Sequence, residues 1–168
     1  MSDPRNRMNR PAAIALTLAL VWVGLAAATA RADLSGVGGS LGLASPQDLD
    51  GTASLGVHAE VTTRNAHLQM VPNMRYWSVD GISDVAPNFD VAYHFQPDRH
   101  MTPYLGGGLG VNFVHNDRLD RSDTDLGINM IGGLRFPGDR NHYFLEGRFT
   151  ASDVSQVSVQ TGITFGTP

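Results

Sequence analysis

The feature that most constrains the fold is the stretch Pro103–His115, whose residues alternate strictly in character. Its apolar side chains fall on alternate positions, at Leu105, Leu109, Val111 and Phe113. The positions between them are small or polar, at Tyr104, Gly106, Gly108, Gly110 and Asn112. A period of two is typical of a β-strand with one apolar face. Because a run of glycine in a strand marks close packing or a tight bend, the stretch predicts a strand in a tightly curved sheet.

The same alternation recurs along the rest of the chain. It is found at about 34–43, 53–63, 66–77, 88–95, 125–136, 142–151 and 155–165. Pro72 falls inside the third segment, and proline cannot donate a hydrogen bond to a neighbouring strand, so we predict a β-bulge there. Beyond residue 32 no segment has convincing helical periodicity. The sequence therefore predicts an all-β domain of eight strands.

The predicted connections differ at the two ends of the strands. Those after odd-numbered strands, at 44–52, 78–87, 116–124 and 152–154, are mostly longer. Those after even-numbered strands, at 64–65, 96–101 and 137–141, are shorter. An even number of strands with long loops at one end and short turns at the other is typical of a transmembrane barrel. We predict an eight-stranded antiparallel up-and-down transmembrane β-barrel, with the long loops outside the cell.

Alternation alone does not distinguish a membrane barrel from a soluble sandwich or barrel. The polar face, however, combines many glycines with long charged side chains, and the inside of an eight-stranded barrel is only just wide enough for side chains. We therefore expect the polar face to point inward, with Gly106, Gly108 and Gly110 leaving room for arginines. Unpaired charge in so narrow a space is costly, so we expect the charges to pair into a plug rather than line a pore. The predicted network is Glu60, Arg75, Asp90, Arg135, Glu146 and Arg148.

Aromatic residues on the apolar face support the membrane interpretation. Two groups are predicted near the two ends of the barrel, with smaller aliphatic residues between them. Such groups resemble the aromatic girdles that form at the two membrane–water interfaces. The group near the long loops is Tyr76, Phe89, Phe113 and Phe149, and the group near the short turns is Phe95, Phe136, Tyr143 and Phe165.

Residues 1–32 have the pattern of a secretory signal peptide. Three arginines precede an apolar run at 12–28, and Ala30-Arg31-Ala32 follows it. This order predicts cleavage between Ala32 and Asp33, which leaves 33–168 as the barrel domain. An uncleaved membrane anchor is the alternative, and translation could begin at Met8 as well as at Met1.

Composition excludes several classes of function. The chain has no Cys, so disulfides and thiolate metal sites are excluded. Residues 33–168 hold 8 Arg, no Lys and 15 acidic residues, a formal charge of −7. This charge argues against a nucleic-acid partner.

The predicted barrel resembles the small bacterial outer-membrane β-barrel proteins of the OmpA/OmpX-like superfamily. The resemblance covers essentially 34–165, and it rests on the glycine-rich strand that begins at Pro103 and on the runs 129–136, 143–149 and 162–165. It implies an outer-membrane location, contact with outer-membrane lipids and lipopolysaccharide, and insertion by the outer-membrane assembly machinery. Family barrels usually end on an aromatic residue, whereas here Phe165 is followed by Gly166-Thr167-Pro168.

The sequence gives little indication of a metal site, a calcium site or a catalytic site. The six histidines lack the spacing of a metal site, and the acid-rich segment 117–125 lacks the glycine and closing glutamate of a calcium loop. Some eight-stranded outer-membrane barrels are lipid A-modifying enzymes, which need a Ser, a His and an acid at the outer rim. Ser122 and Asp123 lie near His115 in sequence, without a recognisable motif. We predict no catalytic residue, cofactor or metal.

The sequence thus favours a monomeric, non-enzymatic outer-membrane barrel with a structural role or a surface ligand at its outer loops. One alternative is a periplasmic soluble β-barrel that binds an apolar ligand, in which the Leu, Val and Phe face would point inward. A second alternative is the lipid A-modifying enzyme.

Overall fold

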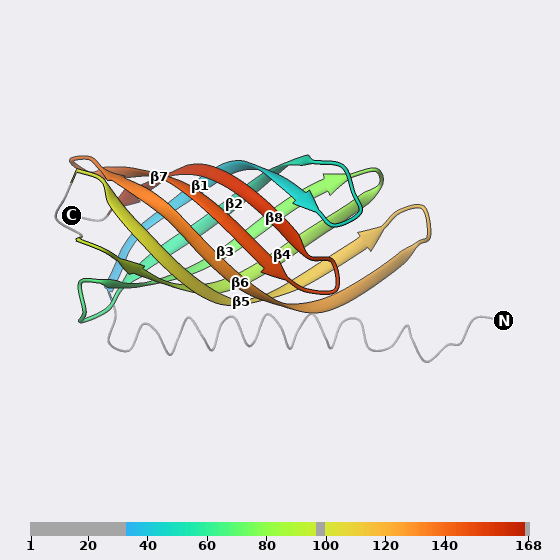
Figure 1. Cartoon of the computed structure of the whole chain (residues 1–168), viewed down its shortest axis with the longest axis horizontal. Coiled ribbons are helices and arrows are strands. Elements are labelled where there is room, and N and C mark those ends of the chain that lie inside the picture. The colour runs from blue at the N-terminus through green and yellow to red at the C-terminus, as the bar shows by residue number, and fades with distance from the viewer. Residues whose placement is uncertain (1–32, 97–99, 167–168) are drawn as a thin grey trace. The chain divides into compact units, whose positions relative to one another are not determined.

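The computed structural model describes residues 33–96 and 100–166 of the chain, so the predicted signal peptide and Ala32 lie outside the described residues. The described residues form one closed barrel, in which each strand pairs antiparallel with the next and the last pairs with the first (Figure 1). The strands are β1 (Asp33–Pro46), β2 (Thr52–Thr62), β3 (Leu68–Val79), β4 (Ile82–His94), β5 (Thr102–Asn116), β6 (Arg121–Pro137), β7 (Asn141–Ala151) and β8 (Gln156–Gly166). The predictions of an all-β fold, of eight strands and of an up-and-down barrel are confirmed.

The connections at the two ends correct the predicted loop pattern. We call the end that carries the β1–β2, β3–β4, β5–β6 and β7–β8 connections the hairpin end, and the opposite end the turn end. The long loop predicted at 78–87 is wrong, because β3 and β4 continue until only Asp80 and Gly81 separate them. These two residues have φ angles of 53° and 77°. Positive φ at both central residues is the conformation of the tight type I′ hairpin turn.

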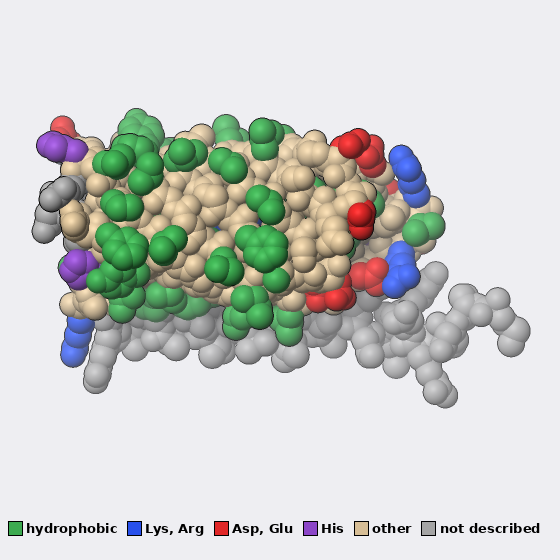
Figure 2. All heavy atoms as spheres, in the orientation of Figure 1, with side chains coloured by type: hydrophobic (Ala, Val, Ile, Leu, Met, Phe, Trp, Pro, Cys, Tyr) green, Lys and Arg blue, Asp and Glu red, His purple; other side chains and the backbone are tan. Residues whose placement is uncertain are grey.

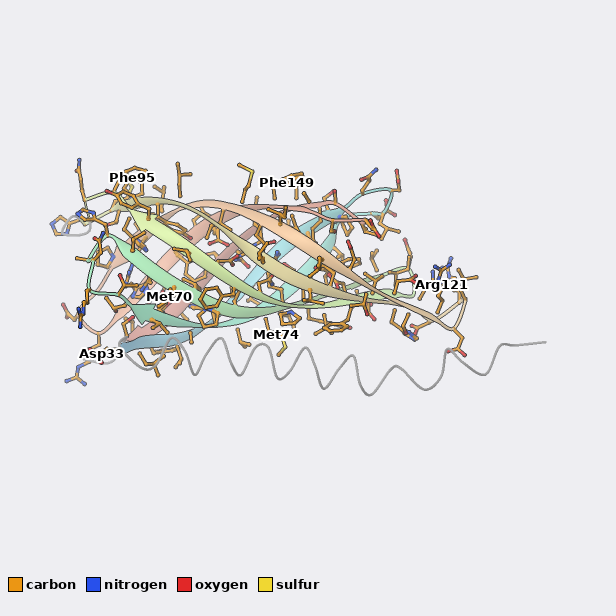
Figure 3. The ribbon with its side chains drawn as sticks, turned by 90° about the horizontal axis from the view of Figure 1, so that it is seen from below. Asp33, Met70, Met74, Phe95, Arg121 and Phe149 are labelled. Atoms are coloured by element: carbon orange, nitrogen blue, oxygen red, sulfur yellow. The ribbon has the colours of Figure 1, made fainter. Side chains whose placement is uncertain are left out.

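The long loop predicted at 116–124 is wrong for a similar reason. β5 and β6 stay paired from Thr102 and Arg135 to Asn116 and Arg121, so the loop shortens to 117–120. The pairing of β7 with β6 stops at Ile128. Residues 121–127 of β6 therefore pair with β5 but not with β7. Figure 3 shows Arg121 at the tip of this hairpin.

The bulge predicted at Pro72 is also wrong. Strands β2 and β3 keep one register on both sides of it, from His58 opposite Asn73 to Val61 opposite Met70. The paired positions are simply interrupted between these two pairs, where proline has no N–H to offer. On its other side Pro72 pairs with Phe89 in unbroken register. The register shift of the barrel lies in β1 instead, between Leu34 and Gly36.

The barrel has its apolar side chains outside and its polar side chains inside. Leu41, Leu109 and Leu126 are 63%, 66% and 75% exposed on the outer wall, whereas Asp90 and Thr164 are fully buried. Figure 2 shows hydrophobic side chains spread along the wall and charged side chains gathered at the two ends. This arrangement is the reverse of what the soluble apolar-ligand barrel requires. Among residues 33–96 and 100–166, no helix is long and apolar enough to cross a membrane.

The aromatic groups are only partly arranged as predicted. Phe136 pairs with Tyr143, and Phe165 pairs with Asn141, so these rings share the turn end with Phe95. The second group is not at one level with the hairpin tips. Figure 3 shows Phe149 well back from Arg121, because the β5–β6 hairpin extends beyond the other strands.

Candidate functional site: the polar lumen

The centre of the lumen holds an ion-paired cluster around Arg148. Its Nη2 atom lies 2.7 Å from Oδ2 of Asp90 and 3.2 Å from Oε1 of Glu146. Tyr104 donates to Oε2 of Glu146 at 3.0 Å, and Gln160 donates to Oε1 at 2.7 Å. All five side chains are buried and come from β4, β5, β7 and β8. Hydrogen bonds to ionised groups in a dry interior are strong, so this cluster ties opposite walls together.

Asp90 is held from further sides by amides. Asn73 donates to its Oδ2 atom at 2.6 Å, and Asn129 donates to its Oδ1 atom at 3.0 Å. Asn129 also donates to Asn88 and accepts from Thr150. These amides and the Thr150 hydroxyl extend the Arg148 cluster into one continuous network, which offsets the cost of burying the charge of Asp90.

A second cluster at the turn end surrounds Glu60. Its carboxylate lies 3.4 Å from Arg135 and 2.7 Å from His142, and it accepts from Gln69 at 2.7 Å and Thr164 at 3.0 Å. Arg135 reaches Nδ1 of His142 at 2.9 Å. Because a guanidinium only donates, Nδ1 must accept, and Nε2 then carries the proton donated to Glu60.

Arg75 stands apart from both clusters. It is buried in β3, and its Nη2 atom donates to Ser158 at 2.8 Å. Among the described residues it forms no salt bridge, whereas Arg135 and Arg148 do. Of the six residues predicted for the network, the structure therefore joins Asp90, Glu146 and Arg148 in one cluster and Glu60 with Arg135 in another.

Several members of the two clusters are absent from the predicted network. The alternation of the sequence places Tyr104 and Gln69 on the polar face but predicts no role for them in the network. It does not extend to His142, the first residue of its segment. The period of two could have identified all of them. Each lies an even number of positions from a predicted network residue or an inward glycine on its own strand, and such residues share one face of the strand. The missed residues in direct contact with Glu60 or Glu146 are Gln69, Tyr104, His142, Gln160 and Thr164.

The inward glycines have a different role from the predicted one. A Cβ atom on Gly108 would collide with the Phe89 carbonyl and with Oδ1 of Asp90. On Gly110 it would collide with the side chain of Asn88. These glycines therefore admit the backbone and short side chains of the neighbouring β4, and the contacts found there are not with the arginines.

The hairpin end carries a separate constellation on the outer side of β5 and β6. Nδ1 of His115 lies 2.9 Å from the Ser122 hydroxyl, and Nε2 lies 3.1 Å from Oδ1 of Asp117. The structure joins His115 and Ser122, as the enzyme alternative requires, but Asp123 pairs with Arg121 instead. The acid beside the histidine is Asp117.

Metal binding gains no support from the described parts of the chain. No group of three or more His, Asp or Glu side chains there lies together in a way that could hold a metal ion. The lumen histidines are engaged in hydrogen bonds, to Thr164 from His58, to Gln69 from His94 and to Glu60 from His142.

Comparison with known proteins rests on structure. No family model matches the sequence, and no curated protein matches it. Among solved structures, the chain is similar to Neisserial surface protein A, with a TM-score of 0.66 and 13% identity over 79% of this chain and 95% of that one. It is also similar to the N-terminal β-barrel domain of Pseudomonas aeruginosa OprF, with a TM-score of 0.58 and 13% identity over 82% and 100% of the two chains. The fold is that of the small outer-membrane barrels.

The predicted resemblance is thus confirmed at the level of the fold. The outer membrane enzyme PagL shares it too, with a TM-score of 0.52 and 15% identity over 76% of this chain and 98% of that one. Because one fold hosts unrelated functions, these similarities leave the function of this chain to be argued from its own residues.

Proposed function

We propose that this protein is a transmembrane β-barrel of the bacterial outer membrane, with a structural or surface-interaction role and no enzymatic activity in its lumen. The observation that carries the proposal is the outer wall. Large apolar side chains are more than half exposed on β1, β2, β5, β6 and β8, including Leu41, Val57, Leu105, Ile128 and Val159. Soluble monomers rarely expose contiguous apolar patches of more than a few hundred Å². Contact with lipid removes this surface from water.

The backbone supports the same conclusion. A bilayer offers no hydrogen bonds to exposed N–H and C=O groups, so a sheet can span it only when closed. The pairing of β8 with β1 removes the free edges of the sheet along the barrel wall. The strands also have the length that a tilted transmembrane strand needs, at 11 residues in β2, β7 and β8.

We further propose that the lumen is plugged. The clusters around Arg148 and Glu60 join side chains from opposite walls at the centre and at the turn end. A barrel of eight strands has room for side chains and little else. Ions would have to break buried salt bridges to pass.

The hairpin end is the part we propose for contact with lipopolysaccharide or other surface partners. The β5–β6 hairpin carries exposed Arg121 and Asp123 beyond the last pairing with β7. Its free strand edge and dense charges suit a polar partner at the membrane surface. The assembly machinery would act earlier, during insertion.

The test is whether the folded protein is integral to the outer membrane. The expressed full-length chain should remain with outer-membrane fractions through an alkaline carbonate wash, and its unheated form should migrate differently from its heated form on a denaturing gel. Release into a periplasmic extract, with no dependence of migration on heating, would sink the proposal.

A second candidate function is hydrolysis of an acyl ester at the hairpin. One observation favours it, the contact of His115 with both Ser122 and Asp117. If Nε2 donates to Asp117, Nδ1 is left to accept the Ser122 proton, which is the arrangement that activates a serine nucleophile. The apolar surface of β5 and β6 below it would hold the acyl chain, at Val111 and Leu126. The group is largely solvent-exposed, with 43% of the His115 and 72% of the Asp117 side chain accessible, so it ranks behind the structural role.

A further inference from the structure

The β5–β6 hairpin has one open strand edge at the hairpin end. Residues 121–127 of β6 pair with β5, from Arg121 opposite Asn116 to Gly127 opposite Gly110. On the other side, β7 begins to pair with β6 only at Ile128. An edge of this kind presents a row of backbone N–H and C=O groups that have no strand beside them. It is therefore a template on which another strand can pair.

The opposite edge of the projecting hairpins is closed. Strand β2 pairs with β3 as far as Ser54 opposite Trp77. Beyond this pair, Thr52 donates to the Ser78 carbonyl at 2.7 Å. Among residues 33–96 and 100–166, no other strand leaves an edge of comparable length open. A partner strand at this end of the barrel would therefore pair with β6.

Hydrogen bonds to neighbouring hairpins hold the open edge in place. The backbone N–H of Asp117 donates to the Gly81 carbonyl at 2.8 Å, which joins the tips of the β3–β4 and β5–β6 hairpins. The carboxylate of Asp125 accepts from the backbone N–H of Asp153 at 2.5 Å, which ties β6 to the β7–β8 connection. A preordered edge loses little conformational entropy when a partner binds to it.

The hairpin end is strongly acidic. Figure 2 shows acidic side chains gathered at this end, at the right of the view. Arg121, one of the few basic residues there, is already paired with Asp123. Such a surface repels phosphate groups and attracts a basic partner. The four connections and the open part of β6 together hold eight aspartates, Asp48, Asp50, Asp80, Asp117, Asp120, Asp123, Asp125 and Asp153, and two arginines, Arg118 and Arg121.

The side chains on the open edge define a pattern for the partner. Asp123 and Asp125 share one face of β6, and Thr124 and Leu126 share the other. In an antiparallel pair, directly opposite residues lie on the same face. A strand with Arg or Lys at alternate positions would therefore place a basic side chain opposite each aspartate. A second copy of this chain does not fit the pattern, because its edge carries the same aspartates and, in the same membrane, runs in the same direction.

We propose that residues 121–127 of β6 bind an extended basic polypeptide segment as an added antiparallel strand. The inference rests on the surface-interaction role proposed above, and it specifies the partner as a polypeptide. Backbone hydrogen bonds along the edge provide the affinity, and the two aspartates select basic side chains.

The probe is a fluorescent peptide of about nine residues, within the usual length of a strand, that alternates Arg with Val and Thr. It is titrated with the folded full-length barrel in detergent at physiological salt, and fluorescence anisotropy measures the Kd. The control peptide has the same sequence with every backbone nitrogen methylated, which keeps the charges and removes the N–H donors. It should bind at least about tenfold more weakly, because several backbone hydrogen bonds are lost.

Two barrel variants test the position of the site. Asp123→Arg should raise the Kd about five- to tenfold, because an attractive cross-strand pair becomes a repulsive one. Asp50→Arg makes the same change of charge in the β1–β2 connection. It should raise the Kd by about twofold at most, since salt screens charges beyond about 8 Å.

Amide hydrogen exchange of the wild-type barrel gives a second readout. The bound peptide should slow exchange in residues 121–127 and leave residues 47–51 unchanged. Equal binding of the two peptides, or no protection of 121–127, would overturn the proposal. Binding of lipopolysaccharide aggregates without binding of the peptide would also overturn it, as would a wild-type dimer in detergent that Asp123→Arg converts into monomers.

Failure of this inference is distinguishable from failure of the proposed function. A barrel that stays with the outer membrane through the carbonate wash and does not bind the peptide refutes the strand addition alone. A barrel that the wash releases refutes the membrane location itself.

Discussion

Asp90 and Arg148 meet across the lumen, with Oδ2 of the carboxylate 2.7 Å from Nη2 of the guanidinium. They belong to β4 and β7, which are not neighbours in the sheet. The pair therefore joins opposite sides of the wall, and neither partner is accessible to solvent. The lumen therefore holds the walls of the barrel together, as the apolar core does in a soluble protein, but through hydrogen bonds and ion pairs.

Removing one partner of this pair should destabilise the barrel strongly. Arg148→Met leaves Asp90 and Glu146 buried without their counter-ion, and we expect a loss of about 3–5 kcal/mol in the free energy of unfolding. Urea unfolding of the protein refolded in detergent micelles measures it. In a double-mutant cycle, Asp90→Asn combined with Arg148→Met should cost less than the sum of the two single changes. Additive effects would show that the two charges do not stabilise each other.

Glycine packing gives a prediction with a matched control. Gly108 points inward against the Phe89 carbonyl and Asp90, whereas a Cβ on the outward Gly147 would meet nothing nearer than the Gly132 carbonyl at 3.8 Å. Gly108→Ala should destabilise the barrel by about 1–3 kcal/mol, as overpacking does. Gly147→Ala should change stability by less than about 0.5 kcal/mol. Both are measured by urea unfolding, and similar effects at the two sites would contradict the assignment of Gly108 to the inner face and Gly147 to the outer face.

Much of this architecture could be predicted from sequence because strand parity is a local property. Once Leu105 and Leu109 are assigned to one face, the inward position of Tyr104 follows. The turns between the strands were harder to predict than the strand faces. The dipeptide Asp80-Gly81 is a strong signal for a tight hairpin, but it lies in a stretch, 78–87, whose Asp, Ser and Gly residues are equally typical of a longer loop.

The pairing of charges could not be predicted in the same way. Which inward residues meet across the lumen depends on the shear of the barrel, the sum of the register shifts around all eight strands. The sequence of a single strand does not determine it. Asp90 and Glu146 both reach Arg148, whereas Arg75 reaches Ser158. The sequence identified the six charged side chains as inward, but it could not show that one arginine would have two carboxylates and another none.

The outer wall gives a direct prediction about the membrane. Leu109 and Leu119 are similarly exposed, at 66% and 71%, but Leu109 lies within β5 and Leu119 lies in the β5–β6 connection. In a bilayer, Leu109→Arg should cost about 2–4 kcal/mol near the midplane, and Leu119→Arg should cost nearly nothing. Folding into lipid vesicles, followed by denaturant titration, measures both. Equal and small effects would contradict a lipid-facing wall.

A plugged lumen should not conduct. Insertion of the wild-type barrel into planar bilayers should leave the current close to that of the bare membrane, because the Arg148 and Glu60 clusters block the path. Glu146→Gly together with Arg148→Gly removes two long central side chains and should raise the conductance severalfold. Arg121→Gly at the hairpin tip is the control and should leave it unchanged. High conductance of the wild-type protein, insensitive to the central double change, would refute the plug.

The hairpin constellation predicts which substitutions would abolish an acyl hydrolase and which would not. Purified barrel in detergent is assayed with a fatty acyl ester, and intact envelopes are analysed for shortened lipid A by mass spectrometry. If the second candidate function is correct, Ser122→Ala should lower the rate at least about 10³-fold, because the nucleophile is lost. Asp117→Asn should also lower it substantially, since His115 then loses the carboxylate that orients it. Asp123→Asn is the matched control, because Asp123 pairs with Arg121 rather than with His115. No turnover by the wild-type protein, or turnover that survives Ser122→Ala, would leave the hairpin with a binding or structural role only.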